Sequence, residues 1–458
     1  FAEKGYVGDR YGVDGGFVLR RITDDQDKQK HFFMFGAMGL GGRGAYALDL
    51  SKINGNYPAA APLFDVKNGD KNGKNRVEVE LGYTVGTPQI GKTRNGTYSA
   101  FLASGYAAKK IDDSTNKTAL YVYDLKNTLG TPIAKIEVKD GKGGLSSPTL
   151  VDKDLDGTVD IAYAGDRGGN MYRFDLSNSD PGKWSVSTIF EGTKPITSAP
   201  AVSRLADKRV VIFGTGSDLT EDDVLNTGEQ YIYGIFDDDK GTVKVTVQNG
   251  TGGGLLEQVL TQENKTLFLN KGSDGSGSKG WVVKLKEGER VTVKPTVVLR
   301  TAFVTIRKYN DGGCGAETAI LGINTADGGA LTPRSARPIV PGDQVAQYSG
   351  HLKTAGGKSV PIGCMWKNGK TVCPNGYVYD KPVNVRYLDE KKTDDFPVTA
   401  DGDAGGSGTF KEGKKPARNN RCFSGKGVRT LLMNDLDSLD ITGPMCGIKR
   451  LSWREVFF

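Results

Sequence analysis

Four aspartates alternate along one short stretch in the first half of the chain: Asp152, Asp154, Asp156 and Asp160. Gly157 lies among them, where a tight turn needs a residue that tolerates a positive φ. Calcium takes several oxygen ligands, and a loop of this kind supplies them from carboxylates and a backbone carbonyl. We therefore expect a Ca2+ site with side-chain ligands from the four aspartates and a carbonyl ligand from Thr158.

The stretch matches the EF-hand pattern only in part. That pattern requires a Glu at the twelfth loop position and a helix on each side, whereas Tyr163 holds this position and both flanks have the apolar character of strands. We interpret it as a short calcium loop that joins or bulges two strands. The alternative is an Asp- and Gly-rich turn that binds nothing. Mutual repulsion among clustered carboxylates favours the calcium loop.

The sequence offers few residues for other kinds of functional site. The chain has only His31 and His351, and no Cys-x-x-Cys, so neither a zinc site nor a His-based catalytic triad is well supported. The Gly-rich stretch 39–44 precedes a strand, where a dinucleotide fingerprint needs a helix. The basic stretch 410–429 mixes Lys and Arg with Gly, Asn and Pro, which favours a solvated loop over a phosphate- or heparin-binding site.

The cysteines all lie in the C-terminal third: Cys314, Cys364, Cys373, Cys422 and Cys446. Cys364 and Cys373 flank a turn-like segment, which is compatible with a hairpin disulfide. Clustered cysteines together with a calcium loop suggest an oxidising compartment. The odd count leaves one thiol unpaired or paired outside this chain.

Length and composition suit a large all-β protein. The 458 residues include 64 Gly, which suits many short strands joined by tight turns, and 61 Lys and Arg against 54 Asp and Glu give a mildly basic chain with no single basic stripe. No apolar run is long enough to span a bilayer, and we see no signal peptide. The start at Phe1 indicates a piece excised from a longer protein.

Three sequence pieces recur in the first half of the chain. One is a strand that ends in Asp, at 44–50, 119–125, 170–176 and 230–237. The second is a small-residue turn before Pro, at 85–88, 145–148 and 197–200. The third is an apolar strand that closes in Gly, at 33–36, 101–105, 161–165 and 210–214.

This recurrence predicts a β-propeller. Where all three pieces occur, the order is Pro turn, Gly strand, Asp strand, repeated roughly every 50 to 75 residues. We expect one domain over residues 1–458, a modified β-propeller of about seven blades with long loop insertions and a calcium-binding loop. The later blades are more degenerate, and we expect residues 451–458 to form a terminal strand that closes the ring.

Residues 152–175, DKDLDGTVDIAYAGDRGGNMYRFD, resemble the C-terminal domain of the type IV pilus biogenesis and tip-adhesin family, PilC/PilY type. The segments 195–200 (PITSAP), 211–216 (VIFGTG), 451–455 (LSWRE) and 11–16 (YGVDGG) also carry the resemblance. It spans essentially the whole chain and looks closest to the Neisseria-like PilC branch.

The resemblance implies the C-terminal part of a larger secreted protein, exported through the periplasm to the outer membrane, the cell surface and the pilus tip (fimbrium). It implies a non-enzymatic role in pilus assembly against retraction, twitching motility, virulence and host-cell adhesion. The implied partners are pilus subunits or minor pilins and a host receptor, with no nucleic acid. The family's calcium site matches Asp152, Asp154, Asp156, Thr158 and Asp160. Some members carry an Arg-Gly-Asp tripeptide for integrins, and this chain has none.

Two alternatives are kept open. Quinoprotein dehydrogenases are also propellers with related blade motifs, but this chain lacks an adjacent Cys pair, and its one strong carboxylate cluster lies within a local loop. A carbohydrate-binding propeller is the other alternative.

Overall fold

The structure, a computed structural model, describes residues 12–24, 26–72, 77–106, 116–238, 244–263, 266–271, 277–298, 300–313 and 315–329, and beyond these only short strands as far as residue 457. Described residues form six sheets of four to six strands and three two-stranded ribbons. The all-β propeller class predicted from the repeats is confirmed. The five cysteines lie outside the described residues.

The first three sheets follow the chain in order, apart from one later strand that joins the first sheet and one that joins the third. The first consists of β30 (Thr409–Lys411), β1 (Phe17–Thr23), β2 (Gln29–Ala37), β3 (Gly44–Asp49) and β4 (Pro62–Lys67). The second consists of β7 (Gln89–Lys92), β8 (Tyr98–Ala103), β9 (Ala119–Asp124) and β10 (Pro132–Glu137). The third consists of β11 (Thr149–Val151), β12 (Ile161–Gly165), β13 (Asn170–Asp175), β14 (Ser185–Glu191) and β18 (Val245–Thr246).

The next three sheets are less regular. The fourth consists of β15 (Ala201–Arg204), β16 (Arg209–Gly214), β17 (Tyr231–Asp237), β21 (Gly280–Lys284), β19 (Leu255–Glu263) and β20 (Thr266–Lys271). The fifth consists of β22 (Glu289–Arg290), β23 (Thr296–Val298), β24 (Thr301–Asn310) and β25 (Gly315–Asn324). The sixth consists of β26 (Arg337–Pro338), β29 (Val383–Arg386), β31 (Gly425–Leu432) and β32 (Ser438–Met445).

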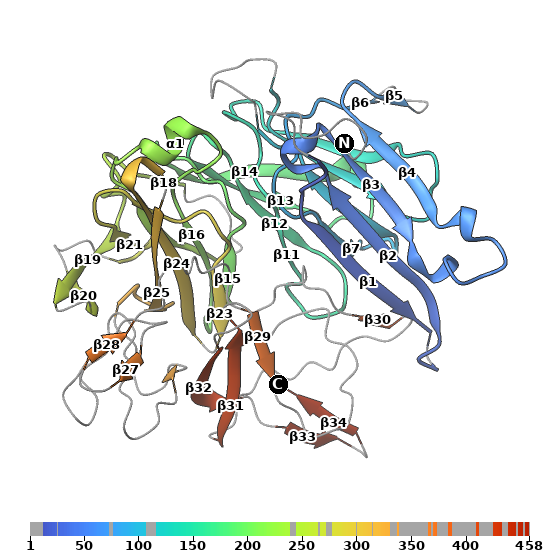
Figure 1. Cartoon of the computed structure of the whole chain (residues 1–458). Helices are drawn as coiled ribbons and strands as arrows, with labels where there is room; N and C mark the ends of the chain where they lie inside the picture. Colours follow the sequence, from blue (N-terminus) through green and yellow to red (C-terminus); the bar gives the residue numbers. More distant parts are fainter. Residues whose placement is uncertain are drawn as a thin grey trace.

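Short elements complete the description. The two-stranded ribbons are β5 (Lys71–Asn72) with β6 (Val77–Glu78), β27 (Met365–Lys367) with β28 (Lys370–Val372), and β33 (Ile448–Leu451) with β34 (Arg454–Phe457). The helical turns are η1 (Gly39–Gly41), η2 (Leu50–Lys52), η3 (Pro58–Ala60), α1 (Glu221–Leu225), η4 (Pro181–Lys183) and η5 (Asp311–Gly313). The β3–β4 connection, with η2 and η3, projects from the rim of the first sheet (Figure 1).

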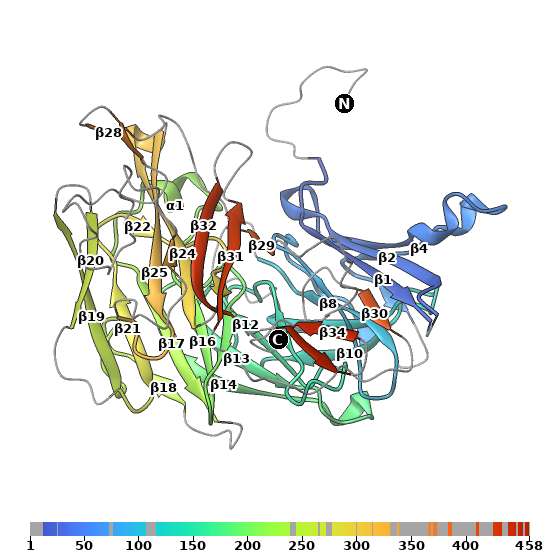
Figure 2. The same ribbon diagram turned by 90° about the horizontal axis from the view of Figure 1, so that it is seen from below.

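The sheets follow one another around a common centre, as the blades of a propeller do. One strand of each sheet contacts its counterpart in the next, in the order β1, β7, β11, β15, β23 and β29. The sixth sheet stands beside the fifth, next to β24 (Figure 2). Between β29 and β31 of the sixth sheet, the chain also reaches the first sheet, where β30 pairs in parallel with β1.

The closing strand differs from the expectation. Among the described residues, β34 pairs with β33 in a ribbon of their own, and β30 is the C-terminal strand that joins the first sheet. A short antiparallel ladder at the extreme C-terminus satisfies its backbone groups locally. The count of about seven blades stays a prediction.

The three recurring sequence pieces occupy equivalent places. The Pro turns precede the central strands β7, β11 and β15, the Gly-closing strands are β2, β8, β12 and β16, and the Asp-ending strands are β3, β9, β13 and β17. Hydroxyl groups of the Pro turns link neighbouring sheets: Ser147 Oγ accepts from the Thr87 N–H at 2.9 Å, and Ser146 Oγ donates to the Ile196 carbonyl. The repeat therefore encodes both the sheet and its connection to the next.

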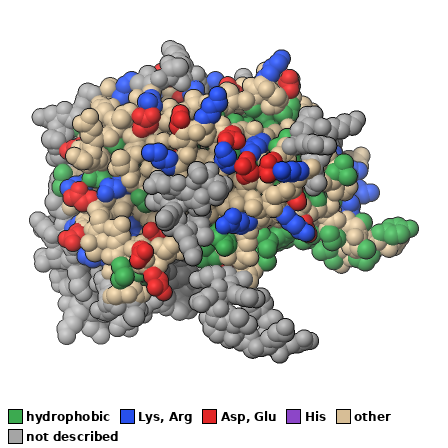
Figure 3. Space-filling model, turned by 90° about the horizontal axis from the view of Figure 1, so that it is seen from above, with side chains coloured by type: hydrophobic (Ala, Val, Ile, Leu, Met, Phe, Trp, Pro, Cys, Tyr) green, Lys and Arg blue, Asp and Glu red, His purple; other side chains and the backbone are tan. Residues whose placement is uncertain are grey.

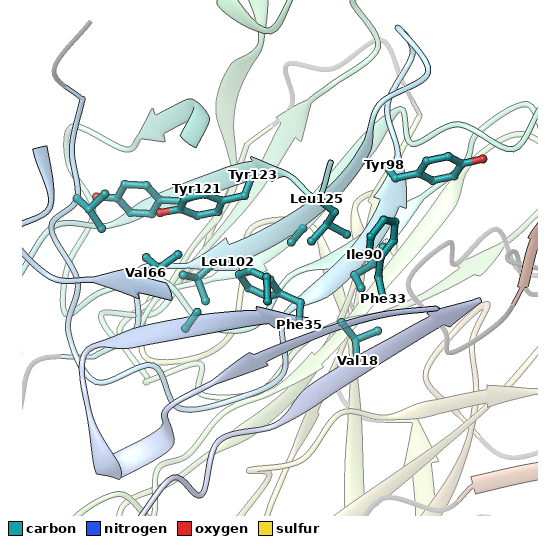
Figure 4. Packing of buried hydrophobic residues seen from close by; sticks show 14 of the residues in the cluster. Val18, Phe33, Phe35, Val66, Ile90, Tyr98, Leu102, Tyr121, Tyr123 and Leu125 are labelled. Carbon is teal, nitrogen blue, oxygen red and sulfur yellow. The ribbon is translucent and has the colours of Figure 1, made fainter. Parts of the chain in front are cut away.

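The apolar cores lie between neighbouring sheets. One cluster joins the first and second sheets, with Phe35 and Tyr123 stacked at a centroid distance of 6.2 Å (Figure 4). Three further clusters occupy the next three gaps between sheets. A strand covered on both faces is buried throughout, as β8 is, whereas β1 alternates between buried and less buried side chains.

No helix among the described residues has the length and apolar character needed to cross a membrane. On the face seen in Figure 3, basic and acidic side chains are intermixed rather than gathered into regions of one sign. The exposed large apolar side chains include Ile53 and Tyr57 on the projecting β3–β4 connection.

Candidate metal centre

The carboxylate loop, residues 152–160, joins β11 to β12 in the third sheet. The last residue of β11 pairs with the first residue of β12, Val151 with Ile161. The N–H of Asp160 donates to the Val151 carbonyl at 2.9 Å, and its carbonyl accepts from the Leu176 N–H at 2.8 Å. The predicted strand flanks, in place of EF-hand helices, are confirmed. The ladder fixes both ends of the loop.

The loop turns around the carboxylate of Asp152. This side chain is fully buried, and its two oxygens accept from the backbone N–H groups of Asp156 at 3.1 Å and Gly157 at 2.6 Å. Leu155 and Gly157 have φ values of 58° and 90°. Glycine takes this conformation without steric cost, whereas leucine pays roughly 1–2 kcal/mol, so the surrounding hydrogen bonds must hold Leu155 there.

Three aspartates point their ligand atoms at one place. Carboxylate oxygens of Asp152, Asp154 and Asp156 all lie within 4.8 Å of one another. Carboxylate oxygens are the donors preferred by hard divalent cations such as Ca2+ and Mg2+. The structure therefore brings together three of the predicted ligands as an acidic triad that could hold a metal ion.

The other two predicted ligands lie in the same loop. Asp160 is 4% exposed, and its Oδ2 accepts from the Lys153 N–H at 2.9 Å. Thr158 donates to Asp156 Oδ1 from its N–H at 2.9 Å and from its hydroxyl at 2.6 Å. Metal ligation by the Asp160 carboxylate and the Thr158 carbonyl stays a prediction.

Burial and mutual repulsion disfavour the charged state of the loop. Burial raises the pKa of Asp152 to about 7, and the charges of Asp156 and Asp160 act in the same direction. Burial also raises the pKa of Asp160, and the charge of Asp154 adds to this effect. A divalent cation would offset these costs, so the charge and the donor set both fit a metal of this kind.

Neighbouring sheets contact the loop from both sides. From the second sheet, the carbonyl of Lys92 accepts from the Val159 N–H at 2.8 Å, and Arg94 forms an ion pair with Asp156. From the fourth sheet, Arg204 donates to the Lys153 carbonyl at 3.2 Å. The loop thus ties three sheets together. These contacts were missed from the sequence, since no local pattern connects Arg94 with a residue 62 positions away.

The sequence model of the family described as "PilY1 beta-propeller domain" matches residues 1–272. The chain belongs to the PilY1 β-propeller family. Among curated relatives, the type IV pilus biogenesis factor PilY1 of Pseudomonas aeruginosa strain UCBPP-PA14 is 28% identical over 65% of this chain and 30% of its own length. A PilY1 homolog of Xylella fastidiosa is 29% identical over 62% of this chain and 22% of its own length. The chain therefore spans less than a third of these PilY1 relatives.

A solved structure agrees with the family assignment. The crystal structure of the Pseudomonas aeruginosa PilY1 C-terminal domain superposes with a TM-score of 0.56 at 25% identity, over 70% of this chain and 72% of that one. The resemblance to the type IV pilus family is confirmed at the level of PilY1.

Proposed function

We propose that this chain is the calcium-binding propeller of a type IV pilus-associated protein, and that its role is binding and assembly rather than catalysis. The single observation that carries the proposal is the acidic triad, with Asp152 fully buried, in a loop that contacts both neighbouring sheets. Membership of the PilY1 family and the pilus biogenesis role in its relatives' names support the cellular setting. We also propose that, within the family, this chain belongs to the Neisseria-like PilC branch.

Calcium suits the loop better than magnesium. Ca2+ accepts irregular sets of six to eight oxygen ligands, whereas Mg2+ demands near-ideal octahedral geometry and gives up water reluctantly. We propose carboxylate ligands from Asp152, Asp154, Asp156 and Asp160 and a carbonyl ligand from Thr158. The bound ion would supply positive charge to a loop whose carboxylates otherwise repel one another, and its role would be structural.

Bound calcium would make the part of the propeller around this loop more rigid. The loop contacts strand ends of the second and fourth sheets at Lys92 and Arg204, and the turn after β7 at Arg94. Fixing the loop would therefore fix the neighbouring turns, and rigid scaffolds position loops for recognition. We propose that such loops bind pilus subunits or minor pilins at the pilus tip, and a host-cell receptor, at the bacterial surface.

Calcium binding is tested by titration of the whole chain with CaCl2, followed by calorimetry and by melting temperature. We expect saturable binding and a melting temperature that rises by a few degrees, because a ligand at 100 times its Kd stabilises the fold by about 2.7 kcal/mol. Asp152→Asn keeps the size of the side chain and should abolish both effects. Asp175→Asn, an exposed aspartate of the same sheet, should preserve them. An equal shift in both variants would contradict the site.

The pilus role is tested in the parent organism with Asp152→Asn in the full-length protein. We expect fewer surface pili, a smaller twitching zone and weaker attachment to host cells. Pili should return when retraction is also disabled, if the protein counteracts retraction. Normal piliation with a variant that binds no calcium would show that pilus assembly does not depend on the metal site.

A further inference from the structure

We propose that Arg94, a cation from the neighbouring sheet, competes with the metal for Asp156. It pairs with Asp156 when calcium is absent and thereby raises the calcium concentration at which the loop is filled. This inference rests on the proposed calcium site. It adds a residue outside the loop that sets the affinity of that site.

The two oxygens of Asp156 have different partners. Its Oδ1 accepts from both the N–H and the hydroxyl of Thr158, at 2.9 and 2.6 Å. A carboxylate oxygen has two lone pairs, so these bonds use the capacity of Oδ1. Arg94 Nη1 donates to Oδ2 and lies 3.4 Å from Thr158 Oγ1. The oxygen that remains for a metal is therefore the one that the guanidinium contacts.

The turn that carries Arg94 is held firmly. It joins β7 to β8, and its ends are linked by the Thr93 N–H, which donates to the Thr97 carbonyl at 2.9 Å. The Asn95 side chain accepts from the Thr93 hydroxyl at 2.6 Å and from the Thr97 N–H at 3.1 Å. A closed hairpin turn thus positions Arg94 beside the loop, next to the backbone hydrogen bond between Lys92 and Val159.

The charge of Arg94 acts on the metal in two ways. In the metal-free loop, it offsets one of the clustered negative charges, which stabilises that state. In the metal-bound loop, a guanidinium beside a divalent cation is repelled, and this repulsion grows as screening by water decreases. Both effects weaken calcium binding. The carboxylate side chain of Asp156 is only 13% exposed, so water screens the pair incompletely.

The test compares calcium affinity, by calorimetry at low ionic strength, in wild type, Arg94→Gln and Lys117→Gln. Lys117 is the matched control: its side chain is 40% exposed, against 38% for Arg94, and it pairs with Glu137, which lies in the second sheet and outside the loop. We expect Arg94→Gln to bind calcium about tenfold more tightly than wild type and to melt at a lower temperature without calcium. Lys117→Gln should match wild type in affinity.

Arg94→Lys keeps the positive charge and provides a second measurement should Arg94→Gln fold poorly. We expect its affinity to stay within about twofold of wild type, because the competing charge is retained. An unchanged or weaker affinity in Arg94→Gln, or a tightened affinity in Arg94→Lys, would overturn the role of Arg94 while leaving the calcium site intact. A wild-type chain that binds no calcium would overturn the site itself.

Discussion

An aspartate that ends the third strand of a sheet is used in different ways along the chain. Asp124 and Asp175 each accept from the N–H two residues ahead, at 2.8 and 3.0 Å, as turn-forming aspartates do. Asp49 makes the same bond with Ser51, at 3.2 Å, but is buried and also accepts from the Nδ1 of His31 at 2.8 Å. Burial alone would raise the pKa of Asp49, but hydrogen bonds from His31, Ser51 and Phe32 outweigh it and lower this pKa.

Asp49→Asn should therefore lower the free energy of unfolding at neutral pH by about 1–3 kcal/mol, because charge-assisted hydrogen bonds are lost. The ordinary pKa of the carboxyl is 3.8, and folding lowers it, so the stabilisation is complete above this value and is lost as pH falls towards the folded pKa.

Urea titrations of wild type and Asp49→Asn at neutral pH and at steps from about pH 5 to pH 3 check this expectation. The gap in stability between the two proteins should narrow as pH falls. A gap that stays constant would show that the charge of Asp49 contributes nothing. Asp124→Asn, a variant at the equivalent repeat position, should cost less than about 1 kcal/mol.

At the scale of elements, the junction between β13 and β17 is held by a polar cluster rather than by apolar packing alone. Asp237 ends β17 and accepts from Arg173 Nη1 of β13 at 2.8 Å and from the Tyr163 hydroxyl of β12. Arg209 Nε donates to the same hydroxyl at 3.1 Å. The cluster connects the third and fourth sheets, as does the hydrogen bond from Arg204 to the Lys153 carbonyl.

Asp237→Ala should destabilise the chain by about 3–5 kcal/mol, because it removes a buried carboxylate that pairs with Arg173 and Arg209. Asp175→Ala, at the same repeat position but exposed, should cost about 0.5–1 kcal/mol. Guanidinium unfolding of the two variants measures the contrast. Equal losses would mean that the cluster between the sheets adds nothing to the stability that Asp237 provides.

For the whole molecule, the apolar clusters make each sheet depend on its neighbours. Phe101 of β8 is fully buried in the cluster that includes Leu150 of β11 and Tyr172 of β13. Each of these sheets needs its neighbours to cover its faces, so the loss of packing between two sheets destabilises both of them.

Phe101→Ala should therefore cost about 3–5 kcal/mol and lower a single melting transition, rather than split off one sheet. Far-UV circular dichroism and tryptophan fluorescence, recorded on the same sample, check whether the transitions coincide. Tyr57→Ala, at 78% exposure on the projecting connection, should change stability by less than about 0.5 kcal/mol. Separate transitions in Phe101→Ala would contradict the dependence between sheets.

The sequence by itself determined the local parts of this protein. Strand periodicity, Pro turns, Gly closures and strand-ending aspartates depend on residues close together in the chain, so the repeat predicted the propeller class. The spacing of Asp152, Asp154 and Asp156 likewise predicted a convergent carboxylate loop between two strands, because a tight turn folds them onto one point.

The tertiary structure alone decided what surrounds that loop. The contacts of Arg94, Lys92 and Arg204 with it depend on how three sheets pack, and residues so far apart carry no shared local pattern. The pairing of β30 with β1 is likewise a long-range contact and was not expected. The conformational preferences of residues close in sequence determine the strands and turns, whereas the burial of both sheet faces determines which strands become neighbours.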